Sequence, residues 1–241
     1  MTLMNSIRMA LRRVGIESYR ATPMTMFELR LPRLLAEHHI KTVFDVGAND
    51  GGFATQLIRG GFKGEIVSFE PLPDAWQKLS EKARAYPTWN VAPPVALSDK
   101  EGEASFNQAG NSTSSSLMAM TDAHTDAAPH SATERTLTIR TTTLDRYVAA
   151  LASPGKCYLK IDVQGAERLV LDGATDALQG LIVGVQLEMS LVELYEGQPL
   201  AMELHAYLTS RGFQLWDIVP GFRSTKTLQL LQYDGIYFKT H

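Results

Sequence analysis

Acidic residues and glycines stand close together in the segment 43–53, which reads VFDVGANDGGF. The apolar run around Asp45 is typical of the end of a buried parallel strand, and a helical pattern begins directly after the glycines. Gly47 and Gly51 therefore occupy a tight turn between a strand and a helix. Because glycine has no Cβ and accepts positive φ angles, backbone N–H groups of such a turn can approach a ligand closely. A side chain at Gly47 is expected to block that ligand without changing the stability of the ligand-free protein.

The order of residues in this turn favours one kind of ligand over another. Asn49 stands where the G-x-G-x-x-G pattern of dinucleotide sites places its second glycine. Asp45 and Asp50 would repel a diphosphate, whereas they would attract a ligand with an ammonium and a sulfonium group. We therefore expect S-adenosylmethionine as the cofactor. The alternative is a turn that only joins two elements, since glycine-rich turns are common in α/β proteins.

A further acid follows at the spacing of a ribose-binding residue. The apolar run 65–69 ends at Glu70, about twenty residues after the glycines, where a doubly wound fold places such an acid. Pro71 then ends the strand abruptly. A carboxylate at the end of a buried strand loses its hydration and needs a partner that compensates for this loss. Glu70 can accept two hydrogen bonds from the cis-diol of a ribose.

Strand and helix patterns alternate along the chain and predict the elements that position these residues. The first half reads βαβαβ, which predicts a doubly wound sheet with right-handed crossovers. The last two strands are joined by the short loop 220–227, which leaves no room for a crossover helix and predicts an antiparallel pair. The segment 107–135 is expected to be an irregular insert, either a lid or a plain loop. The expected strands are 42–46, 65–69, 90–97, 137–144, 157–163, 181–187, 213–219 and 229–239, with helices at 52–59, 166–171 and 200–210.

The composition is that of an ordinary globular protein. Its 241 residues, 44% of them hydrophobic, fit one α/β domain better than two. A net charge of −3 argues against nucleic-acid binding, which normally requires a strongly basic face. The single cysteine, Cys157, excludes an internal disulfide and a multi-cysteine metal site. Its place in an apolar strand favours a buried, inert thiol.

Residues 1–40 are expected to form an N-terminal helical cap on a methyltransferase domain at 41–241. Residues 1–16 carry Arg8, Arg12 and Arg13 between apolar residues, which is a short basic amphipathic pattern. So short a segment favours a cap on the domain or on a second subunit of a homo-oligomer over a membrane anchor. No run approaches the roughly eighteen apolar residues of a membrane span, and a secretory signal is lacking, so a cytoplasmic protein is expected.

Seven motifs in one order make the chain resemble the FkbM family of S-adenosylmethionine-dependent methyltransferases. They read VFDVGANDGGF, FEPLPDAW, ALSDKEGEASF, TLDRY, LKIDVQGAE, LEMSLVELYEGQPL and RGFQLWDIVPGF, and they lie between residues 42 and 239. The resemblance implies an α/β, Rossmann-like fold of class I methyltransferases, with helices on both faces of a seven-stranded, mostly parallel sheet whose C-terminal strand is antiparallel. It also implies methyl transfer, usually to a hydroxyl, with the cofactor at the carboxyl ends of the first strands.

The family motifs also imply roles for individual residues. Glu70 and Pro71 would lie at the ribose, and Ser98 and Asp99 near the adenine, although a turn in SDKEG explains Asp99 equally well. The other cofactor contacts implied are Asp45, Gly47, Ala48, Asn49 and Gly51. The family commonly has Glu where this chain has Gln164, so a role that needs a carboxylate there does not carry over.

Two further acids are candidates for catalytic residues. Asp162 and Glu188 end the predicted strands 157–163 and 181–187, so both carboxylates are expected to face the methyl acceptor. Lys160 shares a face with Asp162 by strand alternation and would hold it ionised. An aliphatic hydroxyl needs a base or a metal to activate it, and we favour a metal-free mechanism because no third ligand is evident.

The acceptor remains open at the level of sequence. The resemblance favours a hydroxyl of a sugar or glycan, and the alternatives are a polyketide or another small-molecule hydroxyl. Two other classes of function compete, a non-catalytic nucleotide-binding protein and an NAD-dependent oxidoreductase. Acids at four strand ends argue against the first class, since a scaffold has no need of them. The absence of the second glycine of the G-x-G-x-x-G pattern argues against an NAD-dependent oxidoreductase.

Overall fold

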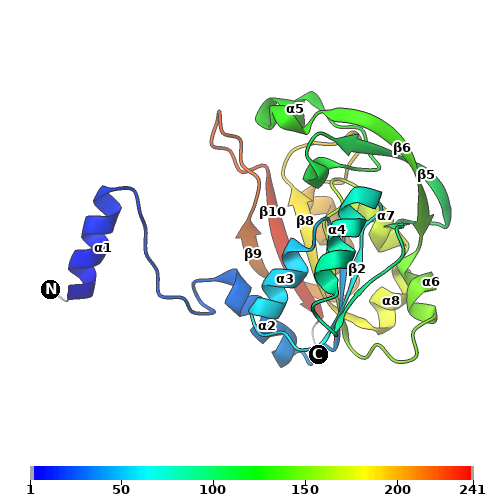
Figure 1. The fold of residues 1–241 in the computed structure, drawn as a ribbon, viewed down its shortest axis with the longest axis horizontal. Coiled ribbons are helices and arrows are strands. Elements are labelled where there is room, and N and C mark those ends of the chain that lie inside the picture. The colour runs from blue at the N-terminus through cyan, green and yellow to red at the C-terminus, as the bar shows by residue number, and fades with distance from the viewer. Residues whose placement is uncertain (1–2, 240–241) are drawn as a thin grey trace.

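The computed structural model describes residues 3–239, and a seven-stranded sheet forms its centre (Figure 1). The strand order is β3-β2-β1-β7-β8-β10-β9. β10 runs antiparallel to both of its neighbours, whereas the other neighbouring strands pair in parallel. The predicted fold class, with its reversed C-terminal strand, is therefore confirmed. The strands are β1 (Thr42–Val46), β2 (Glu65–Phe69), β3 (Trp89–Val91), β7 (Cys157–Ile161), β8 (Ile182–Ser190), β9 (Phe213–Pro220) and β10 (Gln232–Lys239).

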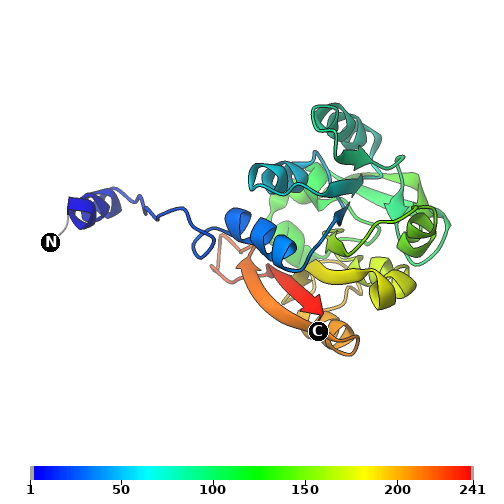
Figure 2. The same cartoon turned by 90° about the horizontal axis from the view of Figure 1, so that it is seen from below.

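Helices cover both faces of this sheet (Figure 2). Apolar side chains of α2, α3 and α4 form one buried cluster with the sheet, and those of α6 to α9 form another on the opposite face. Because β1 and β7 are covered on both sides, every residue of these two strands is buried. The helices are α2 (Phe27–Glu37), α3 (Gly52–Arg59), α4 (Pro73–Ala83), α6 (Leu144–Ala149), α7 (Glu167–Asp172), α8 (Thr175–Gly180) and α9 (Ala201–Thr209).

The predicted strand 90–97 is in fact two strands in two sheets. β3 forms an edge of the main sheet, whereas β4 (Ala96–Leu97) belongs to a three-stranded sheet of order β4-β6-β5. Pro93 and Pro94 separate the two strands, because proline has no N–H to donate to a ladder. The other members, β5 (Gly102–Ala109) and β6 (Thr133–Thr142), form an antiparallel pair.

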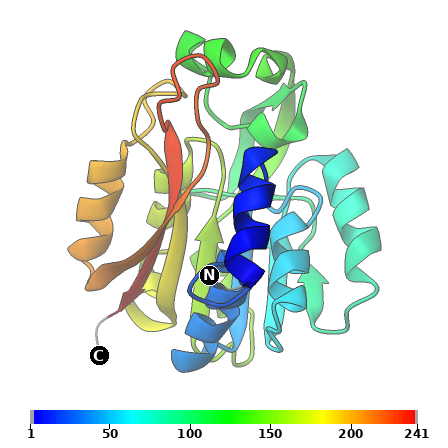
Figure 3. The same ribbon diagram turned by 90° about the vertical axis from the view of Figure 1, so that its left-hand side faces the viewer.

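The segment expected to be irregular contains regular structure. Residues 107–109 belong to β5 and residues 133–135 to β6, and we call residues 110–132 between them the insert. The insert holds η1 (Ser112–Ser114), α5 (Asp122–Ala127) and η2 (Pro129–Ser131). It lies over the carboxyl ends of the parallel strands, at the top of Figure 3. A bridge between Met120 and Tyr195 ties it to the loop after β8.

The N-terminal segment divides into two parts that pack differently. Leu31 and Leu35 of α2 are buried in the cluster that includes α3, so α2 belongs to the body. α1 (Leu3–Arg13) stands clear of the body at the end of an extended linker (Figures 1 and 2). The expected boundary at residue 40 does not coincide with this division, which falls between α1 and α2. No helix within residues 3–239 is long and apolar enough to cross a membrane.

Cys157 opens β7 in the centre of the sheet. Its side chain has no exposed surface, and its Sγ lies 3.4 Å from the carbonyl oxygen of Gly155. Burial raises the pKa of the thiol to about 12. The thiol is therefore protonated at neutral pH and out of reach of solvent, as expected.

Candidate active site

The turn after β1 is held between the two neighbouring strands. The N–H groups of Gly47 and Ala48 donate to the carbonyl of Phe69 at the end of β2, at 3.1 and 3.0 Å. On the other side, a Cβ on Gly47 would collide with the backbone carbonyl oxygen of Asp162, which follows β7. The φ angle of Gly47 is 73°, which glycine adopts without strain. The neighbouring strand thus requires this glycine, and the expectation that a side chain would leave the ligand-free protein unchanged is wrong.

Gly51 and Asn49 shape the rest of the turn. Gly51 precedes α3 with a φ of 80°, and a Cβ there would meet the ring of Trp89. Packing against Trp89 therefore requires a glycine at position 51. Asn49 has a φ of 46°, which is uncommon for a residue with a side chain. This conformation aims its N–H at Glu70 Oε2, at a distance of 2.9 Å.

Glu70 organises the same turn from the end of β2. It is 5% exposed, and its second oxygen, Oε1, accepts a hydrogen bond from the N–H of Leu72 at 2.9 Å. Burial raises the pKa of Glu70 to about 7, although the hydrogen bonds from Leu72 and Asn49 lower it. The partners that a buried carboxylate needs are therefore backbone N–H groups. A carboxylate has further lone pairs, which can accept hydrogen bonds from a ligand.

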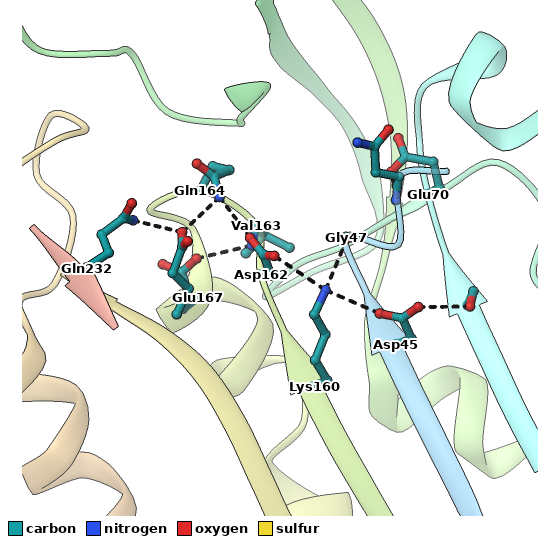
Figure 4. A network of polar contacts seen from close by, with 12 residues as sticks. Asp45, Gly47, Glu70, Lys160, Asp162, Val163, Gln164, Glu167 and Gln232 are labelled. Atoms are coloured by element: carbon teal, nitrogen blue, oxygen red, sulfur yellow. Dashed lines mark hydrogen bonds and ion pairs between the residues drawn. The ribbon is translucent and has the colours of Figure 1, made fainter. Parts of the chain in front are cut away.

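A buried lysine joins the ends of β1 and β7 (Figure 4). Lys160 Nζ lies 3.2 Å from Asp45 Oδ1 and 3.5 Å from Asp162 Oδ2, and it donates to the carbonyl of Gly47 at 3.3 Å. The parallel register sets Asp45 directly opposite Lys160. Burial alone would lower the pKa of Lys160, but the carboxylates of Asp45 and Asp162 raise it above its ordinary value. Lys160 is therefore a cation at neutral pH, in the predicted contact with Asp162.

An amide connects the two acids that were expected to face the acceptor. Gln164 Nε2 donates to Asp162 Oδ1 and to Glu188 Oε2, both at 2.8 Å. The amide is neutral, so it brings two carboxylates together without adding a charge of its own. Asp162 remains open to solvent, with 37% of its side chain exposed.

Glu188 differs from its prediction, because it does not end its strand. β8 continues to Ser190, and Glu188 stands in register with Asp234 on β10. Gln232 Nε2 donates to Glu188 Oε2 at 2.7 Å. Burial and the nearby carboxylate of Asp162 raise the pKa of Glu188 well above its ordinary value. Glu188 therefore helps to hold the Gln164 amide in position and does not line the cavity.

A cavity of about 650 Å³, counting the space open to solvent, lies at the carboxyl ends of β1, β2 and β7. Its lining combines apolar side chains with a few polar groups, which is typical of a small-molecule site. Within residues 3–239, no three His, Cys, Asp or Glu side chains are placed to hold a metal ion together. The lining includes Phe69, Leu72, Val95, Ala96, Leu97 and Phe106 from the body, Thr113, Ser115 and Leu117 from the insert, and Val163 and Gln164 after β7.

The predicted site residues separate into two groups around this cavity. Asp45 is fully buried beneath it, where Ser68 Oγ donates to its Oδ2 at 3.1 Å. Ser98 is also buried, and its hydroxyl donates to Asp99 at 3.0 Å, outside the lining. The cavity is lined by Gly47, Asn49, Glu70, Pro71 and Asp162 but not by Asp45, Ala48, Gly51, Ser98, Asp99, Lys160 or Glu188.

Three residues that complete the site have no role in the sequence argument. The sequence marks Gln164 only as a departure from a motif. Tyr195 donates its hydroxyl hydrogen to Gln164 Oε1 at 2.9 Å, and its only signal is its place in the motif LEMSLVELYEGQPL. Ser116 of the insert donates to the carbonyl of Gln164 at 2.6 Å. Ser116 lies in the run NSTSSSL, where the sequence gives no reason to select it from its neighbours.

The turn, the acids after β2 and β7 and the reversed strand β10 define a methyltransferase domain of Rossmann-like architecture. The chain belongs to the Methyltransferase FkbM domain family, which matches residues 45–215. This confirms the family resemblance found in the motifs.

One relative and two solved structures are also similar to this chain. The hexuronic acid methyltransferase AglP of Haloferax volcanii is 30% identical over 155 residues, which cover 64% of this chain and 56% of AglP. The chain thus matches little more than half the length of that relative. An rRNA methylase from Streptococcus thermophilus has a TM-score of 0.47 at 11% identity, over 93% of this chain and 100% of that chain. The fibrillarin pre-rRNA processing protein of Methanococcus jannaschii has the same TM-score at 9% identity, over 83% and 66%.

Proposed function

We propose that this chain is an S-adenosylmethionine-dependent O-methyltransferase that acts on a hydroxyl of a sugar or glycan. The observation that carries the proposal is the placement of two acids around one cavity. β2 and β7 flank β1 on its two sides, so Glu70 and Asp162 stand on either side of the Gly47 turn. In this proposal Glu70 binds the ribose of the cofactor, and Asp162 faces the acceptor.

The residues around the cavity fit S-adenosylmethionine. Leu72, Leu97 and Phe106 offer apolar surfaces against which an adenine can pack. Glu70 can accept hydrogen bonds from ribose hydroxyls. When bound, the cofactor would supply an electrophilic methyl group.

Asp162 is the residue that we assign as general base or as the group that orients the acceptor. An aliphatic hydroxyl is a weak nucleophile at neutral pH, and a carboxylate within hydrogen-bond reach can accept its proton. Lys160 and Gln164 fix the Asp162 carboxylate from behind, at 3.5 and 2.8 Å. Lys160 also places a positive charge beside this carboxylate.

The choice of a sugar acceptor rests on the AglP relative, whose name describes a hexuronic acid methyltransferase. We therefore place hexuronic acids, free and within oligosaccharides, first in an acceptor screen. Mass spectrometry should detect a product that is heavier by one CH₂ group. A screen in which only polyketide hydroxyls are methylated would retain the methyltransferase and overturn the sugar acceptor.

Calorimetric titration separates the proposal from its rivals. S-adenosylhomocysteine should bind and NAD should not, whereas an oxidoreductase predicts the reverse and a scaffold without a nucleotide site predicts neither. Glu70→Ala should weaken S-adenosylhomocysteine binding by about 1.5–3 kcal/mol, because hydrogen bonds to a charged group are lost. Glu65→Ala, at the exposed start of the same strand, is the matched control and should bind as the parent does. Unchanged binding by a folded Glu70→Ala variant would remove Glu70 from the site.

A further inference from the structure

Gln164 has a backbone conformation that side chains rarely adopt. Its φ angle is 57°, in the left-handed region, and the preceding residues Asp162 and Val163 lead into it directly from β7. Strained conformations of this kind cluster at functional sites and persist only where the surroundings enforce them. The contacts of Gln164 therefore show what enforces its conformation.

Every polar atom of the Gln164 side chain has a partner. Nε2 donates both of its hydrogens, one to Asp162 and one to Glu188, and Oε1 accepts from the hydroxyl of Tyr195. This pattern suits an amide and no other side chain of the same shape. A glutamate of equal size has no hydrogen to donate and would place a third negative charge between two carboxylates.

The contacts that hold Gln164 come from the insert and from the loop beneath it. Ser116 donates to the Gln164 carbonyl at 2.6 Å, and the hydroxyl of Tyr195 also lies 3.1 Å from the carbonyl oxygen of Ser114. The next residue, Gly165, leaves space for Tyr195, because a Cβ there would lie 2.8 Å from its side chain. Tyr195 therefore contacts the insert and Gln164 through one hydroxyl group.

The insert packs on Tyr195 and also covers the cavity. Tyr195 is fully buried, and the imidazole of His124 on α5 lies edge-on to its ring, with 5.1 Å between the ring centroids. The N–H of Thr121 donates to the carbonyl of Leu194 at 2.9 Å. Thr113 and Leu117, at the other side of the insert, line the cavity itself. The insert thus covers the cavity and also packs against Tyr195, which contacts Gln164.

We propose that Gln164 is a positioning residue that orients Asp162 and Glu188, and that Tyr195 makes this orientation depend on docking of the insert. The inference rests on the proposed function, since it gives Asp162 its catalytic orientation. It assigns the insert a second task besides covering the cavity. Asp162 is aligned for an acceptor only when the insert is closed, so Asp162 in an open site is unable to accept a proton in the productive geometry.

Tyr195→Phe tests this coupling, with Tyr207→Phe as the matched control. Both substitutions remove one buried tyrosine hydroxyl, but that of Tyr207 donates to Leu171, outside the site. In Tyr195→Phe, the amides of Ser116 and Thr121 should exchange hydrogen about 5- to 50-fold faster, the range for losing one buried hydrogen bond. Tyr207→Phe should leave these rates unchanged.

Titration of the Glu188 carboxyl by carbon NMR supplies the readout that a merely structural role would not move. Tyr195 donates to Gln164 and not to Glu188, so its hydroxyl can hold Glu188 only through the amide. Tyr195→Phe should raise the pKa of Glu188, because a loosened amide donates less well to the carboxylate. Gln164→Leu should raise it further, and Tyr207→Phe should not change it.

The two measurements need neither cofactor nor acceptor, which keeps this inference separate from the proposed function. If Tyr195→Phe matches Tyr207→Phe in both exchange and titration, the coupling is wrong even when S-adenosylhomocysteine binds. Faster exchange with an unchanged Glu188 titration would reduce Tyr195 to an anchor of the insert and would also overturn the coupling. If the coupling is observed but the parent chain does not bind S-adenosylhomocysteine, the proposed function fails instead.

Discussion

Lys160 is enclosed by carboxylates from two strands, and only one of them could be predicted from the sequence. Strand alternation, continued one residue past the end of β7, puts Lys160 and Asp162 on one face. The contact with Asp45 depends on the register of β1 against β7, which no local pattern contains. Gly47 is a similar case. The glycine is evident in the sequence, but the backbone carbonyl of Asp162 that requires it is not. Residue types could be predicted here, whereas contacts between distant strands could not.

Replacing Lys160 with methionine should be strongly destabilising. The substitution keeps the apolar stem but leaves the buried carboxylate of Asp45 without its cation, which costs about 3–5 kcal/mol in the free energy of unfolding. Urea denaturation measures this loss. Lys156→Met, at an exposed position just before the same strand, should change stability by less than about 0.5 kcal/mol. Equal stability of the two variants would show that the ion pair contributes nothing net.

Asp162→Asn tests the base directly, once the screen has provided an acceptor. Turnover should fall by about 10²–10⁴, the usual contribution of general-base catalysis, while the affinity for S-adenosylhomocysteine changes little. Addition of EDTA should leave the rate of the parent enzyme unchanged. If EDTA abolished activity and Mg²⁺ restored it, Asp162 and Glu188 would have to be reassigned as metal ligands.

Among the elements, α7 begins with a buried acid that ends the motif LKIDVQGAE and has no role predicted from the sequence. Glu167 lies in the first turn of α7, where its Oε1 accepts hydrogen bonds from the N–H groups of Val163 and Gly165 at 3.1 and 3.2 Å. It is 2% exposed, and burial raises its pKa from 4.5 to about 7. Between these two pH values the folded state holds a proton that the unfolded state has released.

The stability of the parent chain should therefore fall as the pH rises from about 5 to 8. Glu167→Gln removes the titrating group, so its stability relative to the parent should rise by about 1–3 kcal/mol over this range. Denaturant unfolding at a series of pH values provides the comparison. Glu81→Gln, on the exposed side of α4, should follow the parent at every pH. If the unfolding free energies of the parent and Glu167→Gln changed with pH in the same way, this would contradict a raised pKa of Glu167 in the folded state.

The elements differ in how far local sequence determines them. The central strands β1 and β7 are short, mainly apolar runs, and the alternation of strand and helix patterns was sufficient to predict the fold. The insert has no such pattern, because α5 is held by tertiary contacts such as the packing of His124 on Tyr195. β4 pairs with β6 across a long stretch of chain, so its separation from β3 could be anticipated only in part from Pro93 and Pro94.

At the scale of the whole molecule, the arm formed by residues 3–18 is set apart from the body. Ile7 and Val14 of the arm are 48% and 72% exposed, and Arg12 pairs with Glu17 within the arm itself. An amphipathic helix with an exposed apolar side usually packs against another surface. We propose that this surface is a second subunit and that the body alone is the folding unit.

Deletion of residues 1–18 should leave the unfolding free energy and S-adenosylhomocysteine affinity of the body nearly unchanged, within about 0.5 kcal/mol. Sedimentation velocity should show a larger species for the full chain than for the shortened one. A full chain that sediments as a monomer would argue against the subunit contact. If the shortened chain were much less stable, the arm would instead pack against the body of the same chain.

Because its single cysteine is buried, this protein can be labelled at chosen positions to measure movements of the insert. Thiol-reactive labels attack the thiolate, and Cys157 is neither exposed nor ionised at neutral pH. New cysteines at exposed positions, such as Ala123→Cys on α5 and Glu81→Cys on α4, would therefore be labelled while the native one stays silent. Spin labels or fluorophores at these two positions would record opening of the insert as a change in one distance, in a chain whose sheet carries no substitution.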